Sequence, residues 1–141
     1  MKNVNDILTQ EYFTLLKTAV TPVPVFRDGY VPKDLVEDAY VMVSAINNTD
    51  NSSMQSHDTI TSVQVGIYTR SNTDNNATVI NDLADKVYTT IMPAPINALF
   101  VNGFQVLTTE LGNDTSPAPL DTGSQLFINR FITFNHKIVH Q

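Results

Sequence analysis

The sequence contains no cysteine at any of its 141 positions. Disulfide bonds, thiolate nucleophiles and thiolate zinc sites are therefore excluded together, because each requires a cysteine side chain. The five glycines are widely spaced, so they cannot form a glycine-rich phosphate-binding loop. No apolar stretch approaches the roughly 20 residues that a membrane-spanning helix needs, and the N-terminus lacks the apolar core of a signal peptide. We expect a protein that is made and folded in the cytosol.

Basic residues are also scarce. Lys and Arg total 8 against 14 Asp and Glu, which gives a formal net charge of −6. A nucleic-acid-binding protein normally neutralises phosphates with a basic stripe, and this sequence has none. The composition therefore argues against sequence-specific nucleic-acid binding. The remaining polar residues are largely Asn, Thr and Ser, a surface that suits a protein packed against neighbours.

The side chains that could carry chemistry are dispersed. His136 and His140 are four residues apart, which on an extended strand separates them by about 13 Å, too far to share one metal ion; we expect them in a solvated chain terminus. The carboxylates, Asp114 among them, fall mainly in expected turns and helix ends. We predict no catalytic residue, no cofactor-binding residue and no metal ligand, and hence no enzymatic activity.

Hydrophobic periodicity predicts two helices and five strands. Residues 4–19 carry one apolar stripe at helical spacing, with Asn3 or Asn5 as the candidate cap. A second such helix begins at Thr73 or Asp74 and ends at Ile91. The expected strands are Val23–Arg27, Ala39–Ile46, Thr59–Arg70, Phe104–Leu111 and Ser124–Val139.

These elements predict an α+β fold in a single domain, residues 1–141. We expect an antiparallel β-sheet with two amphipathic helices packed on one face. Two long loops, 47–58 and 112–123, interrupt it. The last strand is unusually long for a globular protein, and two interpretations stay open. It either bends around its own core, or it projects and packs against a neighbouring subunit.

Such a sheet leaves its second face and its edges in need of cover. Val41, Val43, Phe127 and Phe131 are the apolar residues that we expect on that face. Loops this long in a compact domain are usually functional or disordered. Met54 in the first loop and Leu120 in the second are therefore candidate partner contacts, together with Phe127 and Phe131.

The order of these segments resembles the tail-terminator (tail-completion) and related neck proteins of tailed bacteriophages. The resemblance lies in the order and position of the segments rather than in identical residues. It covers roughly residues 4–139, although both long loops depart from the family pattern. It is carried by the N-terminal helix and by Pro22-Val23-Pro24-Val25-Phe26, Asp38-Ala39-Tyr40-Val41-Met42-Val43, Thr61–Arg70, the helix that ends at Ile91, Gly103-Phe104-Gln105-Val106 and Phe131-Ile132-Thr133-Phe134.

The resemblance implies a structural virion protein in the neck or tail, assembled in the host cytoplasm. Such proteins form homo-oligomeric rings, commonly six- or twelvefold, that join portal or head-completion proteins to the tail and leave a lumen for DNA. They have no catalytic residues to carry over. Two alternatives remain: a non-viral cytosolic protein-interaction module that uses the same sheet, and a small ligand-binding α+β enzyme.

Overall fold

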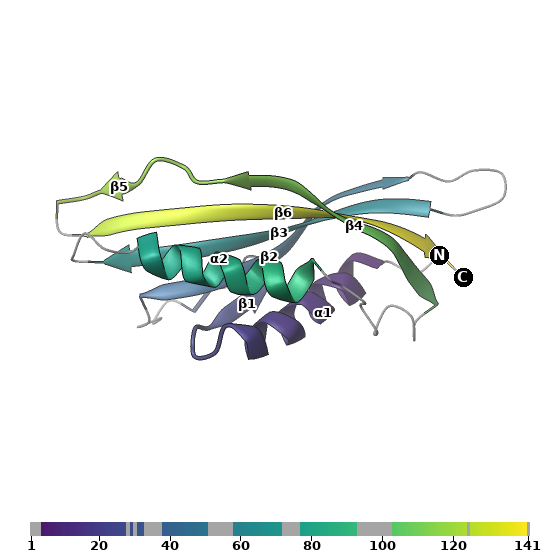
Figure 1. The fold of residues 1–141 in the computed structure, drawn as a ribbon, viewed down its shortest axis with the longest axis horizontal. Coiled ribbons are helices and arrows are strands. Elements are labelled where there is room, and N and C mark those ends of the chain that lie inside the picture. The colour runs from purple at the N-terminus through teal and green to yellow at the C-terminus, as the bar shows by residue number, and fades with distance from the viewer. Residues whose placement is uncertain are drawn as a thin grey trace.

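The computed structural model describes residues 4–27, 29, 31–32, 38–50, 58–71, 77–92, 103–123 and 125–140. Within these residues, six strands form one mixed sheet and two helices pack against it, so the fold is α+β, as expected (Figure 1). In chain order the elements are α1 (Val4–Ala19), β1 (Val25–Arg27), β2 (Ala39–Asp50), β3 (Asp58–Ser71), α2 (Ala77–Ile91), β4 (Phe104–Thr115), β5 (Leu120–Asp121) and β6 (Leu126–His140).

Helix α1 forms where the apolar stripe was expected. Its buried apolar side chains recur at every fourth position, from Val4 through Leu8 and Tyr12 to Leu16, which places them on one face. Asn5 is not the cap; it lies in the first turn, where its carbonyl accepts a hydrogen bond from the Thr9 hydroxyl at 2.8 Å.

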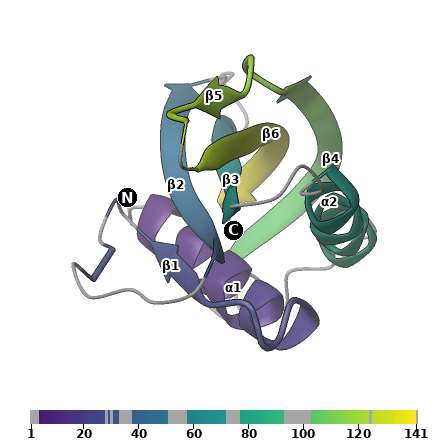
Figure 2. The same ribbon diagram turned by 90° about the vertical axis from the view of Figure 1, so that its left-hand side faces the viewer.

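Helix α2 buries one face in the same way, through Ile80, Leu83, Ala84, Val87 and Ile91. The expected start at Thr73 or Asp74 lies outside the described residues. Figure 2 looks along the strands and shows both helices on one side of the sheet, with β5 on the opposite side. The prediction that two amphipathic helices cover a single face is confirmed.

The sheet has the strand order β1-β2-β3-β6-β4, and β5 pairs with the start of β6. β1 runs parallel to β2, with Val25 opposite Val41, so the expectation of a wholly antiparallel sheet is wrong for this edge strand. All other pairs of neighbouring strands are antiparallel.

Three strands extend into segments that were expected to be loops, and a short fourth strand lies within one of them. β2 continues to Asp50 and β3 begins at Asp58, so the ends of segment 47–58 belong to the sheet, and residues 51–57 lie outside the described part. β4 continues to Thr115, and β5 occupies two further positions of segment 112–123. Irregular backbone within 112–123 is therefore confined, among described residues, to Ser116–Pro119 and the turn after β5.

The long final strand lies inside the sheet. β6 pairs with β3 along its length, from Leu126 opposite Ser71 to Val139 opposite Asp58. β4 pairs with the other side of β6 from Phe131 to His140. β6 is therefore held within its own sheet, and packing of part of it against a neighbouring subunit stays a prediction.

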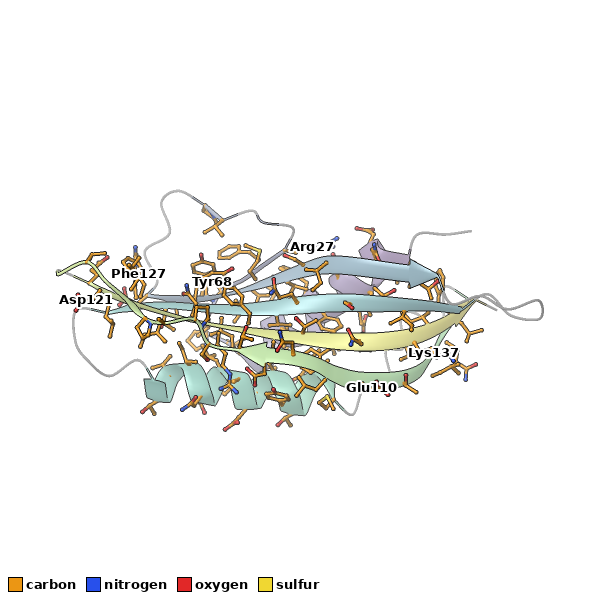
Figure 3. The ribbon with its side chains drawn as sticks, turned by 90° about the horizontal axis from the view of Figure 1, so that it is seen from above. Arg27, Tyr68, Glu110, Asp121, Phe127 and Lys137 are labelled. Atoms are coloured by element: carbon orange, nitrogen blue, oxygen red, sulfur yellow. The ribbon has the colours of Figure 1, made fainter. Side chains whose placement is uncertain are left out.

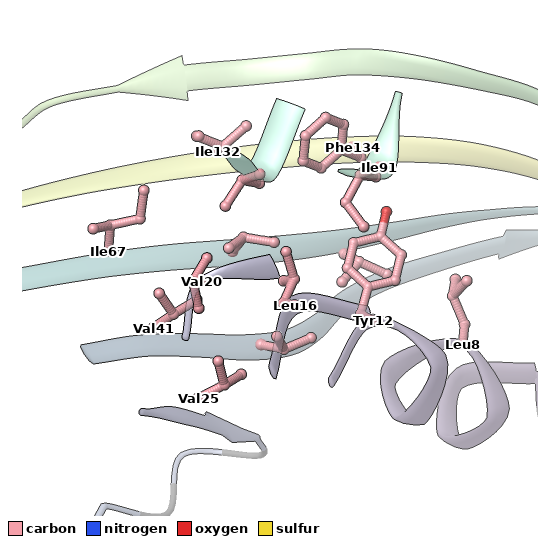
Figure 4. Close-up of a cluster of buried hydrophobic side chains, with 14 of the residues drawn as sticks. Leu8, Tyr12, Leu16, Val20, Val25, Val41, Ile67, Ile91, Ile132 and Phe134 are labelled. Atoms are coloured by element: carbon pink, nitrogen blue, oxygen red, sulfur yellow. The ribbon is translucent and has the colours of Figure 1, made fainter. Parts of the chain in front are cut away.

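The core lies between the helices and the strand residues that face them (Figure 4). Val41 and Val43 are fully buried there, so their expected place on the second face is wrong. They alternate with Tyr40 and Met42 in an unbroken apolar run, and sequence alone does not show which of the two sets points toward the helices. No helix among the described residues is long and apolar enough to cross a membrane.

Candidate functional site: the aromatic end of the helix-free face

Aromatic side chains cross four strands on the face opposite the helices. Tyr40 stacks on Tyr68, its cross-strand partner, with ring centroids 4.7 Å apart and an interplanar angle of 11°. Phe26 meets Tyr40 edge-on at 5.9 Å, and Phe131 meets Tyr68 edge-on at 5.6 Å. We call these four residues the aromatic row. Offset-stacked and edge-to-face pairs at such distances each contribute about 0.5–1.5 kcal/mol beyond burial, so the row is a rigid surface feature.

Gly66 gives the aromatic row its space. A Cβ atom at this position would lie 2.8 Å from a ring carbon of Tyr68 and 3.3 Å from a ring carbon of Phe131. Gly66 is opposite Met42 and Phe131 in a ladder without a register shift at that point. A glycine inside a strand often marks a bulge or a close approach, and the structure shows the close approach, by aromatic rings.

A groove of about 450 Å³ lies beside the aromatic row. Its aromatic walls are Tyr40 and Tyr68 together with Phe127 at the start of β6. Leu120 of β5 lies opposite Phe127 in the ladder and closes one side. The other lining residues are Val31, Pro32, Asp38, Thr69, Arg70 and Asn129.

Polar groups at the groove are few. Arg70 Nε and Asp38 Oδ1 are 3.5 Å apart, and the Arg70 amide donates a hydrogen bond to the Asp38 carbonyl at 2.8 Å. Burial raises the pKa of Tyr40 above its ordinary value, and burial together with neighbouring Tyr40 raises that of Tyr68. Both phenols are therefore neutral at physiological pH, and the groove offers apolar surface with hydroxyl groups rather than a charged nucleophile.

The structure brings two of the predicted contact residues together. Leu120 is 62% exposed, the most exposed of the large described hydrophobic side chains, and it shares the groove with Phe127. Phe131 lies on the same face but packs against Tyr68 instead of lining the groove. Met54 lies outside the described residues. Figure 3 views this face and shows Phe127 near Asp121 at one end of the sheet, with Lys137 toward the other.

Tyr40 and Tyr68 were not among the contact residues predicted from the sequence, although both are part of this surface. Their pairing depends on the register between β2 and β3, which is set by long-range contacts. The one local signal was Gly66, since a glycine inside a strand often marks a close approach.

The rest of this face is mainly polar over its central part, where Glu110 of β4 lies opposite Asn135. The Ser62 hydroxyl donates a hydrogen bond to the Asn135 side-chain oxygen at 2.6 Å across the β3–β6 pair. Gln64 lies opposite Thr133 and Ser44, so these strand positions add amide and hydroxyl groups. The helix-free face is thus divided along the strands, with its large aromatic and apolar side chains gathered at the β5 end.

His136 lies elsewhere, fully buried on the helix side of the sheet, so its expected place in a solvated terminus is wrong. Its Nε2 pairs with the Tyr12 hydroxyl, and its Nδ1 lies 3.0 Å from the Thr109 hydroxyl oxygen. Desolvation lowers the pKa of His136 to about 4, so the ring is neutral at physiological pH. No group of three or more His, Asp or Glu side chains among the described residues could hold a metal ion.

Comparison with known proteins gives a match at the level of structure. No protein-family model and no curated relative matches the sequence. A chain of the solved structure "Virion of native gene transfer agent (GTA) particle" is similar, with a TM-score of 0.63 at 10% sequence identity. The match covers 96% of this chain and 92% of that chain. At this identity the similarity shows a shared fold, which extends over nearly the whole length of both chains.

Proposed function

We propose that the chain is a structural subunit of a phage-like virion, where it forms an oligomeric ring in the neck or tail. In that position it joins portal or head-completion proteins to the tail, as the resemblance to tail-terminator proteins implies. The lumen of a six- or twelvefold ring leaves a passage for DNA. The net charge of −6 suits such a passage, because like charge keeps a wall from gripping nucleic acid.

The observation that carries this proposal is the exposed aromatic end of the helix-free face. Leu120, Phe127 and the stacked tyrosines offer concentrated apolar surface around a groove, and such patches on soluble proteins mark interaction sites. The similarity in fold to a chain of a virion particle supports the same role. A non-enzymatic role is part of this proposal, and the described lining of the groove, with two neutral phenols and one ion pair, supports an interaction surface.

A second candidate function follows from the groove itself. Aromatic-lined grooves of this kind also bind extended peptide segments of partner proteins, so the chain could be a protein-interaction module outside any virus. The two functions differ in oligomeric state, because the module works as a monomer and the virion subunit works as a ring.

The test combines imaging with incorporation. Purified chain, alone and mixed with candidate portal and neck proteins from the same genome, is examined by mass photometry and negative-stain electron microscopy. We expect rings. The double variant Leu120→Ser/Phe127→Ser should fold, as judged by circular dichroism, and should enter particles at least tenfold less often. Val79→Ser, which alters an exposed residue of α2, is the matched control. A chain that stays monomeric with all these partners and never enters particles contradicts the proposal.

A further inference from the structure

Both outer edges of the sheet are open among the described residues. β4 is the last strand of the sheet, and no described strand pairs with its outer side. At the opposite border, β1 covers only Val41–Val43 of the twelve-residue β2. The stretch Ser44–Asp50 therefore also has an uncovered outer side. Within the described part of the chain, two strand edges thus have no neighbouring strand along Thr108–Leu111 of β4 and Ser44–Asp50 of β2.

These edges lack proline and lysine and are not short, although both carry register shifts and β4 has the exposed, charged Glu110. Natural edge strands are commonly blunted by proline or lysine, or by being short. β4 spans twelve residues without either residue type, and its Leu107 and Leu111 side chains are 48% and 46% exposed. The open stretch of β2 likewise has neither, and its Ile46 is 50% exposed. Exposed leucine and isoleucine at two open edges indicate surfaces that are covered in the assembled state.

Register shifts limit how much of each edge can pair regularly. β4 has shifts between Val106 and Thr108 and between Leu111 and Asn113, and β2 has one between Ala45 and Asn47. The stretches that lie beyond these shifts are Thr108–Leu111 in β4 and Asn47–Asp50 in β2. These are the two stretches that can pair regularly where one copy meets the next. Four residue pairs at about 3.3 Å each would give a ladder about 13 Å long, enough for a specific but reversible contact.

The strand directions decide which edges can meet in a ring. β2, β3, β6 and β4 alternate in direction through three successive antiparallel pairs, so β4 runs opposite to β2. Copies related by rotation about an axis along the strands therefore bring β4 of one copy against β2 of the next in the antiparallel sense, the more stable ladder. Such a junction uses two different surfaces, and contacts of this kind close into rings.

We propose that the outer edge of β4 in one copy pairs with the Ser44–Asp50 edge of β2 in the next, so that a continuous intersubunit sheet holds the ring together. This inference rests on the proposed function, because it names the surfaces through which the ring closes.

The inference also gives the aromatic end of the helix-free face a separate role. Tyr40 at the start of β2, Arg70 at the end of β3 and Phe127 at the start of β6 lie at one end of the strands, so the groove faces the protein stacked above or below the ring.

The absence of cysteine from the sequence makes a direct test possible, because any disulfide must come from introduced residues. The double variant Ile46→Cys/Glu110→Cys places one thiol on each edge, and Ser44→Cys or Asn48→Cys in place of Ile46→Cys scans the register. Disulfides form only where Cα atoms approach within about 4.4–6.8 Å. We expect mild oxidation of at least one pair to give a covalent ladder that ends at the ring.

Each single cysteine variant is the control and should give no ladder. Dimers from Glu110→Cys alone would show that β4 pairs with β4 of another copy about a twofold axis, which overturns the inference. The inference would also be overturned if none of the three double variants gave a ladder while wild-type rings were visible by negative stain. In that case the proposed ring would still stand, and only the edge pairing would be wrong.

A second variant tests the contact through the β4 edge without disulfide cross-linking. Leu107→Lys/Leu111→Lys places charge on the exposed side chains of β4, and Val79→Lys adds charge at a comparably exposed position on α2. We expect at least a tenfold loss of rings for the β4 variant, an unchanged urea midpoint for the monomer, and no loss for the control. Rings that persist in the β4 variant overturn the edge contact alone, whereas a wild-type chain that never forms rings overturns both proposals.

Discussion

His136 shows how one buried polar residue can connect three elements. Its ring nitrogens lie against hydroxyl groups of Tyr12 in α1 and Thr109 in β4, while its own backbone lies in β6. Tyr12 also packs edge-on against the imidazole, with centroids 5.5 Å apart. A neutral imidazole has one donor and one acceptor nitrogen, so it can pair with both hydroxyls without leaving a buried polar atom unpaired.

The first prediction is an acid-sensitive stability that depends on His136. The folded pKa of about 4 lies below the ordinary 6.5, so the unfolded state binds the proton more readily. Stability is therefore complete above pH 6.5 and falls as the pH drops toward 4, by up to about 3 kcal/mol. Urea unfolding at pH 7 and pH 4.5 measures this loss.

His136→Gln is the matched variant, because an amide keeps a donor and an acceptor but does not titrate in this range. We expect its stability to change much less between pH 7 and pH 4.5. An equal loss in both proteins would assign the acid sensitivity to other groups. Asp114, whose pKa its hydrogen bonds to Arg130 hold below the ordinary 3.8, contributes only at lower pH.

At the scale of the elements, α2 is tied to the sheet by a cluster around Asp114. Arg130 of β6 donates two hydrogen bonds to this carboxylate, at 2.9 and 2.7 Å, and Tyr88 of α2 donates a third at 2.5 Å. Arg130 also reaches Asn81 of α2 at 3.2 Å. Burial and the hydrogen bond to Asp114 raise the pKa of Tyr88 to about 12. The cluster thus joins α2, β4 and β6.

The second prediction is that Asp114→Ala destabilises the fold by about 2 kcal/mol, because it leaves a mostly buried guanidinium and a phenol without their acceptor. Both charged side chains are about one-fifth exposed, which keeps the loss below that of a fully buried pair. Asp82→Ala is the control. It removes an exposed pair with Lys86 four residues along α2, worth less than about 0.5 kcal/mol. Equal urea midpoints for the two variants would contradict the structural role of the cluster.

The helices and most strands could be predicted because their apolar residues recur at the period of the element that forms. β4 shows where this fails. Gly112, Asn113, Asp114 and Thr115 have the composition of a turn, yet they continue the strand because β6 supplies a ladder and Arg130 a partner for the carboxylate. The short parallel β1 and the burial of His136 depended on contacts distant in sequence, which local patterns do not report.

About half of the candidate site could also be predicted from local sequence patterns. Leu120 and Phe127 are apolar residues in segments that had to lie near a surface, and the structure places both at the groove. The tyrosine stack that lines the groove depends on cross-strand register. An unbroken apolar run such as that of β2 leaves register and facing undetermined, since alternation is the signal that normally sets them.

At the scale of the whole molecule, the chain combines a closed core on one side of the sheet with apolar surface at the groove and at two edges. Its net charge of −6 opposes the association of copies. The proposed contacts are backbone ladders and apolar side chains, which depend little on salt, whereas repulsion between like-charged copies is screened over about 10 Å at 0.1 M ionic strength. The fraction of chains in rings should therefore depend mainly on how strongly salt screens the repulsion between copies.

The third prediction is that rings become more abundant as salt rises. Between about 20 mM and 0.5 M sodium chloride the Debye length shrinks severalfold, so repulsion between neighbouring acidic subunits weakens while apolar and backbone contacts remain. Sedimentation velocity or mass photometry at fixed protein concentration measures the ring fraction, and Val79→Lys, which reduces the charge of each copy, should shift the midpoint to lower salt. Rings that dissociate as salt increases would show that ion pairs between copies, rather than edge strands and apolar surface, hold the assembly together.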